Sequence, residues 1–120
     1  MSLFRDTLRG IAERVEGARA VAIVGLDGIS VEAYGVAQAV SIELVAAELM
    51  AFLKSAQDPR AEMFSGSIRE MTIGGEEFRI VLSRISRRYY LLLLLGDEGI
   101  LGQGRYELAR AAAALEKELV

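Results

Sequence analysis

The run YYLLLLLG, at residues 89–96, is the most apolar stretch of this 120-residue chain and restricts its fold more than any other segment. It is compatible with a membrane span, the middle of a buried helix, or a strand covered on both faces. A spanning helix needs about 20 apolar residues, but Arg88 and Asp97 enclose this run. Gly96 ends it too early for a buried helix. We therefore predict a central strand, and other elements must cover both faces of its sheet.

The composition is that of one globular domain, spanning residues 1–120, with 52% hydrophobic and 26% charged residues. The net charge of −3 argues against a nucleic-acid binder, which usually carries a basic surplus. The chain has neither cysteine nor histidine, so disulfides, thiolate nucleophiles and Cys or His metal sites are excluded, and we predict no cofactor. The charged N-terminus lacks the apolar core of a signal peptide. We expect a soluble cytoplasmic protein without membrane insertion.

Hydrophobic periodicity predicts the order helix, two strands, helix, three strands, helix. The predicted helices span about residues 2–16, 40–57 and the segment after Asp97, and the strands about 18–26, 29–34, 67–73, 78–83 and 89–96. Ser2 and Ser41 are predicted N-caps. The short connections imply an antiparallel sheet. Because three helices must cover two faces, we expect the first and last helices on one face and the middle helix on the other.

The first two strands are predicted to form a tight hairpin. Asp27-Gly28 is a strong turn signal, because glycine tolerates the positive φ that such turns need. In the return strand, Ile29, Val31 and Ala33 alternate with polar residues and Tyr34. We expect the side with Ile29, Val31 and Ala33 to be the drier face.

Two segments carry more apolar surface than one chain needs. The middle helix has an apolar face about 160° wide at about 100° per residue, wider than a minimal core stripe. The strand SIREMTI, at Ser67–Ile73, has weak alternation and a charged middle, which is typical of an edge strand. Deep burial within one chain is one interpretation of the helix, but we favour contact with another chain.

Four further patterns were weighed as sites. GILGQG, at Gly99–Gly104, lacks the spacing of phosphate-binding loops, and we predict a flexible or closely packed helix start. Glu76-Glu77 and Asp97-Glu98 are predicted to be solvated turns rather than catalytic pairs. The arginines of the last hairpin are either an anion or partner patch, or a charged tip that protects the neighbouring apolar run from aggregation; they are Arg84, Arg87 and Arg88.

The order and spacing of these segments resemble the Roadblock/dynein light chain family over nearly the whole chain. The most specific pieces are the GLDG hairpin and LGQGRYEL at the start of the last helix. The chain is most similar to the stand-alone prokaryotic MglB-like members. The resemblance implies an α+β fold of order α-β-β-α-β-β-β-α. It would have a five-stranded antiparallel sheet, two helices on one face and one on the other, in a profilin-like layout.

The resemblance also implies sites and partners. Members typically dimerise by pairing the third strand and the middle helix across a twofold axis, which matches the edge-like strand and the wide apolar helix. The expected homodimer interface comprises Val45, Leu49, Phe52, Ile68, Glu70, Met71 and Thr72. The expected GTPase-binding residues are Leu44, Ala47, Glu48, Ala51 and Ser55.

The resemblance favours a non-catalytic homodimeric regulator, a GTPase-activating partner of a small Ras-like GTPase. The alternative is a scaffold or adaptor subunit of a signalling or motility complex, without effect on GTP hydrolysis. A small-molecule sensor would need a lined pocket, and the sequence offers no convergent polar set for one. An enzyme is the least favoured class, and no catalytic residue is assigned.

Overall fold

A computed structural model describes residues 2–35, 41–60 and 66–119 of the chain. These residues form the elements α1 (Leu3–Arg14), β1 (Ala18–Gly25), β2 (Ser30–Gly35), α2 (Ile42–Ala56), β3 (Glu70–Gly74), β4 (Phe78–Arg84), β5 (Tyr89–Gly96) and α3 (Leu101–Leu115). The predicted element order and the α+β class are confirmed. Val40, the predicted first residue of the middle helix, lies outside the described residues.

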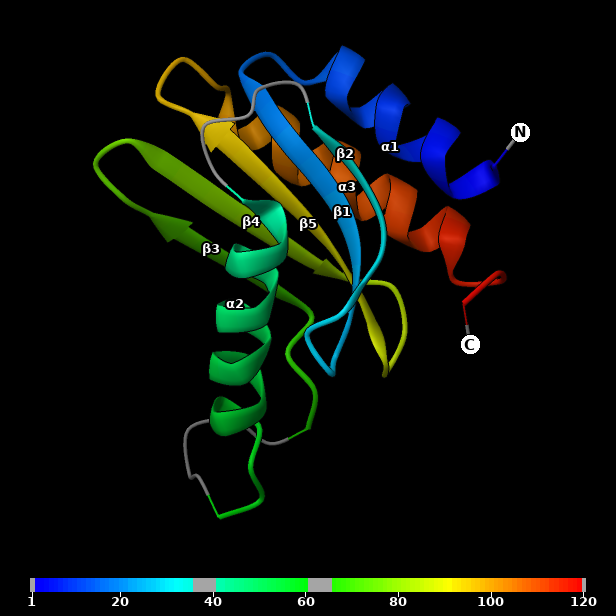
Figure 1. The fold of residues 1–120 in the computed structure, drawn as a ribbon, viewed down its shortest axis with the longest axis vertical. Coiled ribbons are helices and arrows are strands. Elements are labelled where there is room, and N and C mark those ends of the chain that lie inside the picture. The colour runs from blue at the N-terminus through cyan, green and yellow to red at the C-terminus, as the bar shows by residue number, and fades with distance from the viewer. Residues whose placement is uncertain (1, 36–40, 61–65, 120) are drawn as a thin grey trace.

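The five strands of the described residues form one antiparallel sheet in the order β2-β1-β5-β4-β3. The apolar run is β5, which lies at the centre between β1 and β4 (Figure 1). Strands β2 and β3 are the two edges. The edge position predicted for SIREMTI is confirmed, although the strand begins at Glu70 rather than Ser67.

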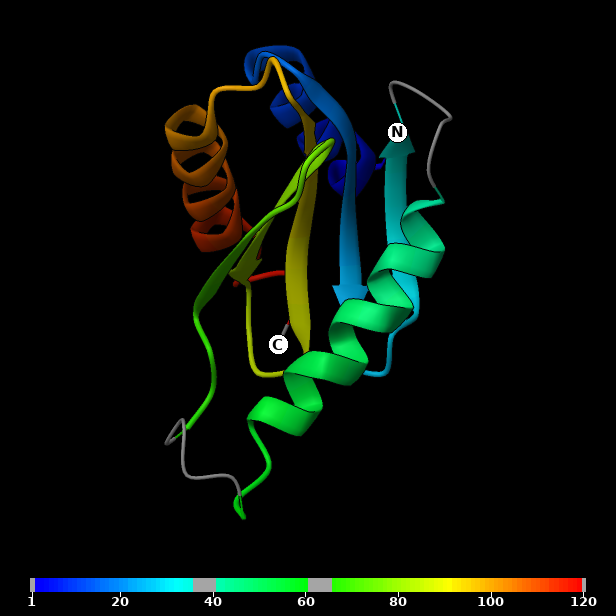
Figure 2. The same cartoon turned by 90° about the vertical axis from the view of Figure 1, so that its left-hand side faces the viewer.

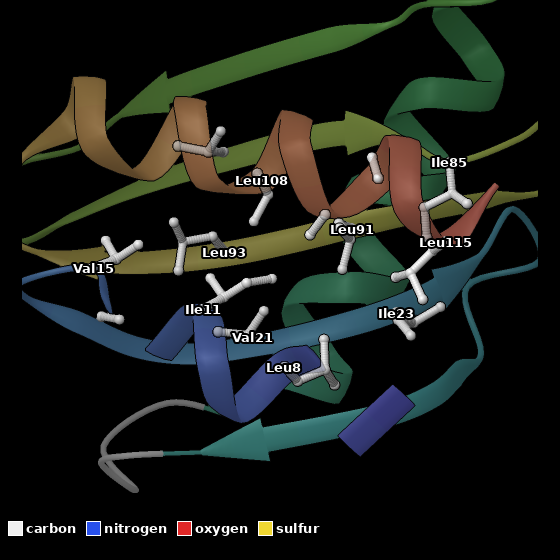
Figure 3. Packing of buried hydrophobic residues seen from close by; sticks show 14 of the residues in the cluster. Leu8, Ile11, Val15, Val21, Ile23, Ile85, Leu91, Leu93, Leu108 and Leu115 are labelled. Carbon is white, nitrogen blue, oxygen red and sulfur yellow. The ribbon is translucent and has the colours of Figure 1, made fainter. Parts of the chain in front are cut away.

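Strand β5 contributes alternate side chains to two separate cores, as expected for a strand covered on both faces. Leu91, Leu93 and Leu95 pack beneath α1 and α3, together with residues such as Leu8 and Leu108 (Figure 3). Tyr90, Leu92 and Leu94 point to the other face and pack with the buried side of α2. All six side chains are buried, which accounts for the continuous apolar run in the sequence.

The helices divide between the two faces as predicted. Helices α1 and α3 lie side by side on one face, and α2 lies alone on the other, where it packs over β1 and β2 (Figure 2). Consequently the α2 side of β4 and β3 has no helix above it among the described residues.

The predicted caps are present. The hydroxyl of Ser2 accepts a hydrogen bond from the Arg5 N–H, and that of Ser41 from the Leu44 N–H, each at 3.3 Å. Gly28 adopts a φ of +86° in the β1–β2 turn. Helix α3 begins without a side-chain cap, and a Cβ on Gly104 would lie 2.9 Å from the side chain of Leu93. GILGQG is therefore a closely packed helix start.

The expected dry face of β2 is wrong in its first half. Ile29 precedes the strand, and both Ile29 and Val31 are exposed, whereas Tyr34 is partly buried against the α1-side core. The reason is that α1 crosses this edge of the sheet and covers the opposite alternation. Arg5 of α1 pairs with Glu32 and lies over the Tyr34 ring at 5.5 Å from its centroid.

Candidate interaction surface

Helix α2 is wider in its apolar face than the sheet beneath it requires. The sheet-facing residues are buried, namely Ile42, Ala46, Leu49, Met50 and Leu53. Val45 is only partly buried, and Phe52 and Leu44 are 55% and 60% exposed. An exposed phenylalanine on a small helix is costly to hydrate, so this flank is a candidate for contact with another molecule.

Phe52 lies on the flank of α2 that faces the uncovered half of the sheet. Ala47 marks the other flank, because a Cβ on Gly28 in the β1–β2 turn would lie 3.4 Å from the Ala47 Cα. Five residues advance a helix by about 140° net, which places Phe52 on the opposite flank from Ala47. That flank is directed toward β4 and β3.

The uncovered half of the sheet is itself apolar. Met71 and Ile73 of β3 pair in register with Leu82 and Ile80 of β4, so their side chains share the α2 side. Together with the helix flank they form one surface, which we call the open patch: Val45, Phe52, Met71, Ile73, Phe78 and Ile80, none of them fully buried. The sequence reasoning missed Ile73, Phe78 and Ile80 as interface candidates, although their alternation with Arg79 and Ser83 is visible in the sequence.

The open patch ends at an unpaired strand edge. Within the described residues β3 pairs with β4 alone, so its outer N–H and C=O groups have no strand partner. Glu70 and Thr72 are exposed and point to the α3 side, where Glu70 forms a 3.9 Å ion pair with Arg105. An exposed edge beside an apolar surface is a template for pairing with another chain.

Two expected interface residues, Leu49 and Ile68, are buried within the chain and support the open patch from beneath. The Ile68 carbonyl oxygen accepts a 2.6 Å hydrogen bond from the Tyr90 hydroxyl. The expected GTPase-binding residues are all exposed on α2: Leu44, Ala47, Glu48, Ala51 and Ser55. Ala51 points away from the sheet, whereas Ala47 lies beside the β1–β2 turn.

The remaining candidate patterns are ordinary surface features. Glu76, Glu77 and Asp97 are exposed, and Glu98 forms a 2.9 Å ion pair with Arg19. Within the described ranges no cluster of acidic side chains is suited to hold a metal ion. None of the helices described in the structure is long and apolar enough to cross a bilayer.

A scan of family models finds no match, and neither does a search of curated proteins. Solved structures are similar. The match to MglB in a tetrameric arrangement has a TM-score of 0.85 at 16% identity, covering 94% of this chain and 85% of the other. The match to a Roadblock/LC7 domain from Streptomyces avermitilis has a TM-score of 0.80 at 19% identity, covering 99% and 98%. These two matches establish the fold.

A third solved structure carries the relationship beyond the fold. MglC from Myxococcus xanthus is 30% identical, and the match covers 97% of this chain and 98% of that one, with a TM-score of 0.73. The chain belongs to the Roadblock family. It is a Roadblock protein of the MglB-like type, as the resemblance in the sequence indicated. Membership in this family supports a regulatory or adaptor role.

Proposed function

We propose that this Roadblock protein is a non-catalytic homodimeric regulator, the GTPase-activating partner of a small Ras-like GTPase. The observation that carries the proposal is the open patch next to the unpaired edge of β3. A lone chain leaves both the patch and the edge to water. A partner that covers them must offer a strand edge and an apolar helix flank, and a second copy of the chain offers both.

In the proposed dimer, β3 pairs with its twofold-related copy, and the two sheets become one. The open patches then face each other, so that Phe52 packs against the partner copy. We expect a total buried area of at least about 1,200 Å², the lower end of stable interfaces. Edge pairing brings Glu70 and Thr72 into the interface through their backbones, while their side chains stay on the α3 side. The tetrameric arrangement of the similar MglB supports self-association.

The proposed GTPase surface is formed by the two α2 helices of the dimer. The small exposed side chains of Ala51 and Ser55 let a partner backbone come close, and Leu44 supplies an apolar anchor that is 60% exposed. One GTPase can straddle the twofold axis. No arginine of α2 is available to complete a GTPase active site, because Lys54 is the only basic residue of this helix. We therefore expect activation by positioning the GTPase's own catalytic groups.

The test is single-turnover GTP hydrolysis by the Ras-like GTPase encoded nearest to this gene, with and without the purified protein. Stimulated hydrolysis that is lost in Ala51→Arg supports the proposal. Binding in a pull-down without any change in hydrolysis would instead identify a scaffold or adaptor subunit. Failure to bind any Ras-like GTPase recovered from the source would refute the proposed partner.

A further inference from the structure

The arginines of the chain fall into two groups within residues 2–35, 41–60 and 66–119. Most are engaged by the protein itself. Seven form ion pairs with carboxylates, namely Arg5, Arg9, Arg14, Arg19, Arg60, Arg105 and Arg110. Arg79 donates to backbone carbonyl oxygens that include those of Gly96 and Asp97. The arginines without a carboxylate partner in the described residues are Arg69, Arg84, Arg87 and Arg88.

These four arginines line two adjoining cavities at the C-terminal end of α3. A cavity of about 350 Å³ is bounded by Arg69, Arg84 and α3, and one of about 720 Å³ by Arg84, Arg87 and Arg88. The two share Arg84, Ile85 and Glu116. We call the joined feature the arginine groove. Figure 3 shows Ile85 beside Leu115, where the hairpin after β4 meets the end of α3.

The walls of the arginine groove leave room for an extended chain. On the α3 side the lining includes Ala109, Ala112 and Ala113, whose side chains are no larger than a methyl group. On the opposite side the Arg84 guanidinium donates a 2.8 Å hydrogen bond to the Ser67 hydroxyl, which holds it in one position. Of the two acidic residues in the lining, Glu70 is already paired with Arg105. Positive charge therefore predominates in a protein of net charge −3.

We infer that the arginine groove binds an acidic peptide segment of a partner protein. Its guanidinium groups come from the segment before β3, the end of β4 and the β4–β5 turn, so they follow a line rather than converge on one point. A line of cations matches successive carboxylates along a peptide, whereas a lone phosphate needs convergent donors. The concave shape and the alanine wall favour a peptide over a flat anionic membrane surface.

This binding site is separate from the proposed GTPase surface. The arginine groove lies on the α3 side of the sheet, and the open patch and α2 lie on the other side. Acidic-peptide binding therefore does not depend on whether the chain regulates a GTPase. A Roadblock dimer with such a groove on each copy could join two acidic segments and a third partner in one assembly.

The test is fluorescence anisotropy with a fluorescein-labelled oligoglutamate peptide and the full chain. Wild type is expected to bind at low salt and to lose affinity steeply as salt rises, because exposed charge pairs are screened. The double variant Arg87→Glu with Arg88→Glu should weaken binding by about tenfold or more. Arg5→Glu with Arg9→Glu on α1 makes the same charge change away from the groove, and should weaken it by less than about twofold.

Three outcomes would overturn the inference: no peptide binding by wild type at low salt, equal losses in the two double variants, or binding to phosphatidylserine vesicles without binding to the peptide. If the groove variant fails to fold by circular dichroism, the single change Arg84→Gln replaces it. An oligolysine peptide of equal length must not bind at the groove, because the attraction depends on the sign of the charge.

Discussion

The Tyr90 hydroxyl donates a 2.6 Å hydrogen bond to the backbone carbonyl oxygen of Ile68. Tyr90 is in the central strand, and Ile68 is in the segment that leads into edge strand β3. Both side chains are buried in the α2-side core. This contact holds the approach to the exposed edge at a defined position beneath the open patch.

Tyr90→Phe should therefore destabilise the fold by about 1–3 kcal/mol, because it leaves a buried carbonyl without its donor. Urea unfolding followed by circular dichroism measures the change. Tyr89→Phe is the matched control, since the structure assigns the Tyr89 hydroxyl no hydrogen bond among the described residues. Equal stability of the two variants would mean that the contact contributes little.

Leu93→Asp should abolish folded soluble protein. Leu93 is fully buried between β5 and the α1–α3 layer, and an unpaired carboxylate there costs several kcal/mol, close to the whole stability of a small domain. The control is Leu3→Asp, at a leucine that is 54% exposed. Expression, solubility and circular dichroism report the result, and a folded Leu93→Asp protein would contradict the two-sided burial of β5.

The ion pair between Arg14 and Glu107 predicts a pH-dependent contribution to stability. Arg14 of α1 donates a 2.8 Å hydrogen bond to Glu107 of α3. This hydrogen bond, opposed by burial and assisted by Arg110, holds the pKa of Glu107 below its ordinary value of 4.5. A depressed pKa stabilises the fold above the unfolded value, and the stabilisation is lost as the pH falls through the folded value.

Glu107→Gln should accordingly lower the free energy of unfolding by about 1 kcal/mol at neutral pH, a figure discounted because Arg14 is half-exposed. The difference from wild type should shrink as the pH falls below 4.5. Urea unfolding at several pH values measures it. Glu13→Gln, at an exposed residue of α1, provides the control. A difference that stays constant with pH would rule out the charged hydrogen bond as its source.

Phe52→Glu should convert the proposed homodimer into a folded monomer. Light scattering at micromolar concentration should give about twice the 13.0 kDa chain mass for wild type and a single chain mass for the variant. Tyr106→Glu tests the specificity, because Tyr106 is 64% exposed on α3, away from the open patch. A monomeric wild type, or a variant that remains dimeric, would remove this surface from the proposed interface.

Ala51→Arg should leave the proposed dimer intact and stop GTPase binding, because a long charged side chain would keep the partner backbone away. Ala51 is a better probe than Ala47, which lies beside Gly28. Ala114→Arg, at an exposed alanine of α3, is the control. Hydrolysis assays distinguish the variants. If Ala51→Arg stimulates hydrolysis as well as wild type, the GTPase binds elsewhere.

The proposed absence of a catalytic arginine has its own test. Single alanine changes at Arg84, Arg87 and Arg88 should reduce stimulated hydrolysis far less than the roughly thousandfold loss that follows removal of an arginine finger. These variants must first be shown to be folded. A single change that erases stimulation would show that one of these arginines acts directly in the GTPase active site.

The sequence by itself determined the features that depend on near neighbours along the chain. The two-sided apolarity of β5, the width of the α2 face, the caps at Ser2 and Ser41, and the Asp27-Gly28 turn all follow from local periodicity and backbone preference. These signals were sufficient to predict the order of elements and the central strand. They also indicated that α2 and the SIREMTI strand had surface left to cover.

Only the tertiary structure decided what meets across long separations in the chain. Burial of Tyr34 rather than Val31 depends on α1 crossing β2, which no local alternation encodes. The partners Arg14 and Glu107 are 93 residues apart, and Arg69 joins Arg87 in one groove only because β3 folds back beside β4. Local patterns specify which residues need cover or a counter-charge, whereas the packing of distant segments determines which residue provides it.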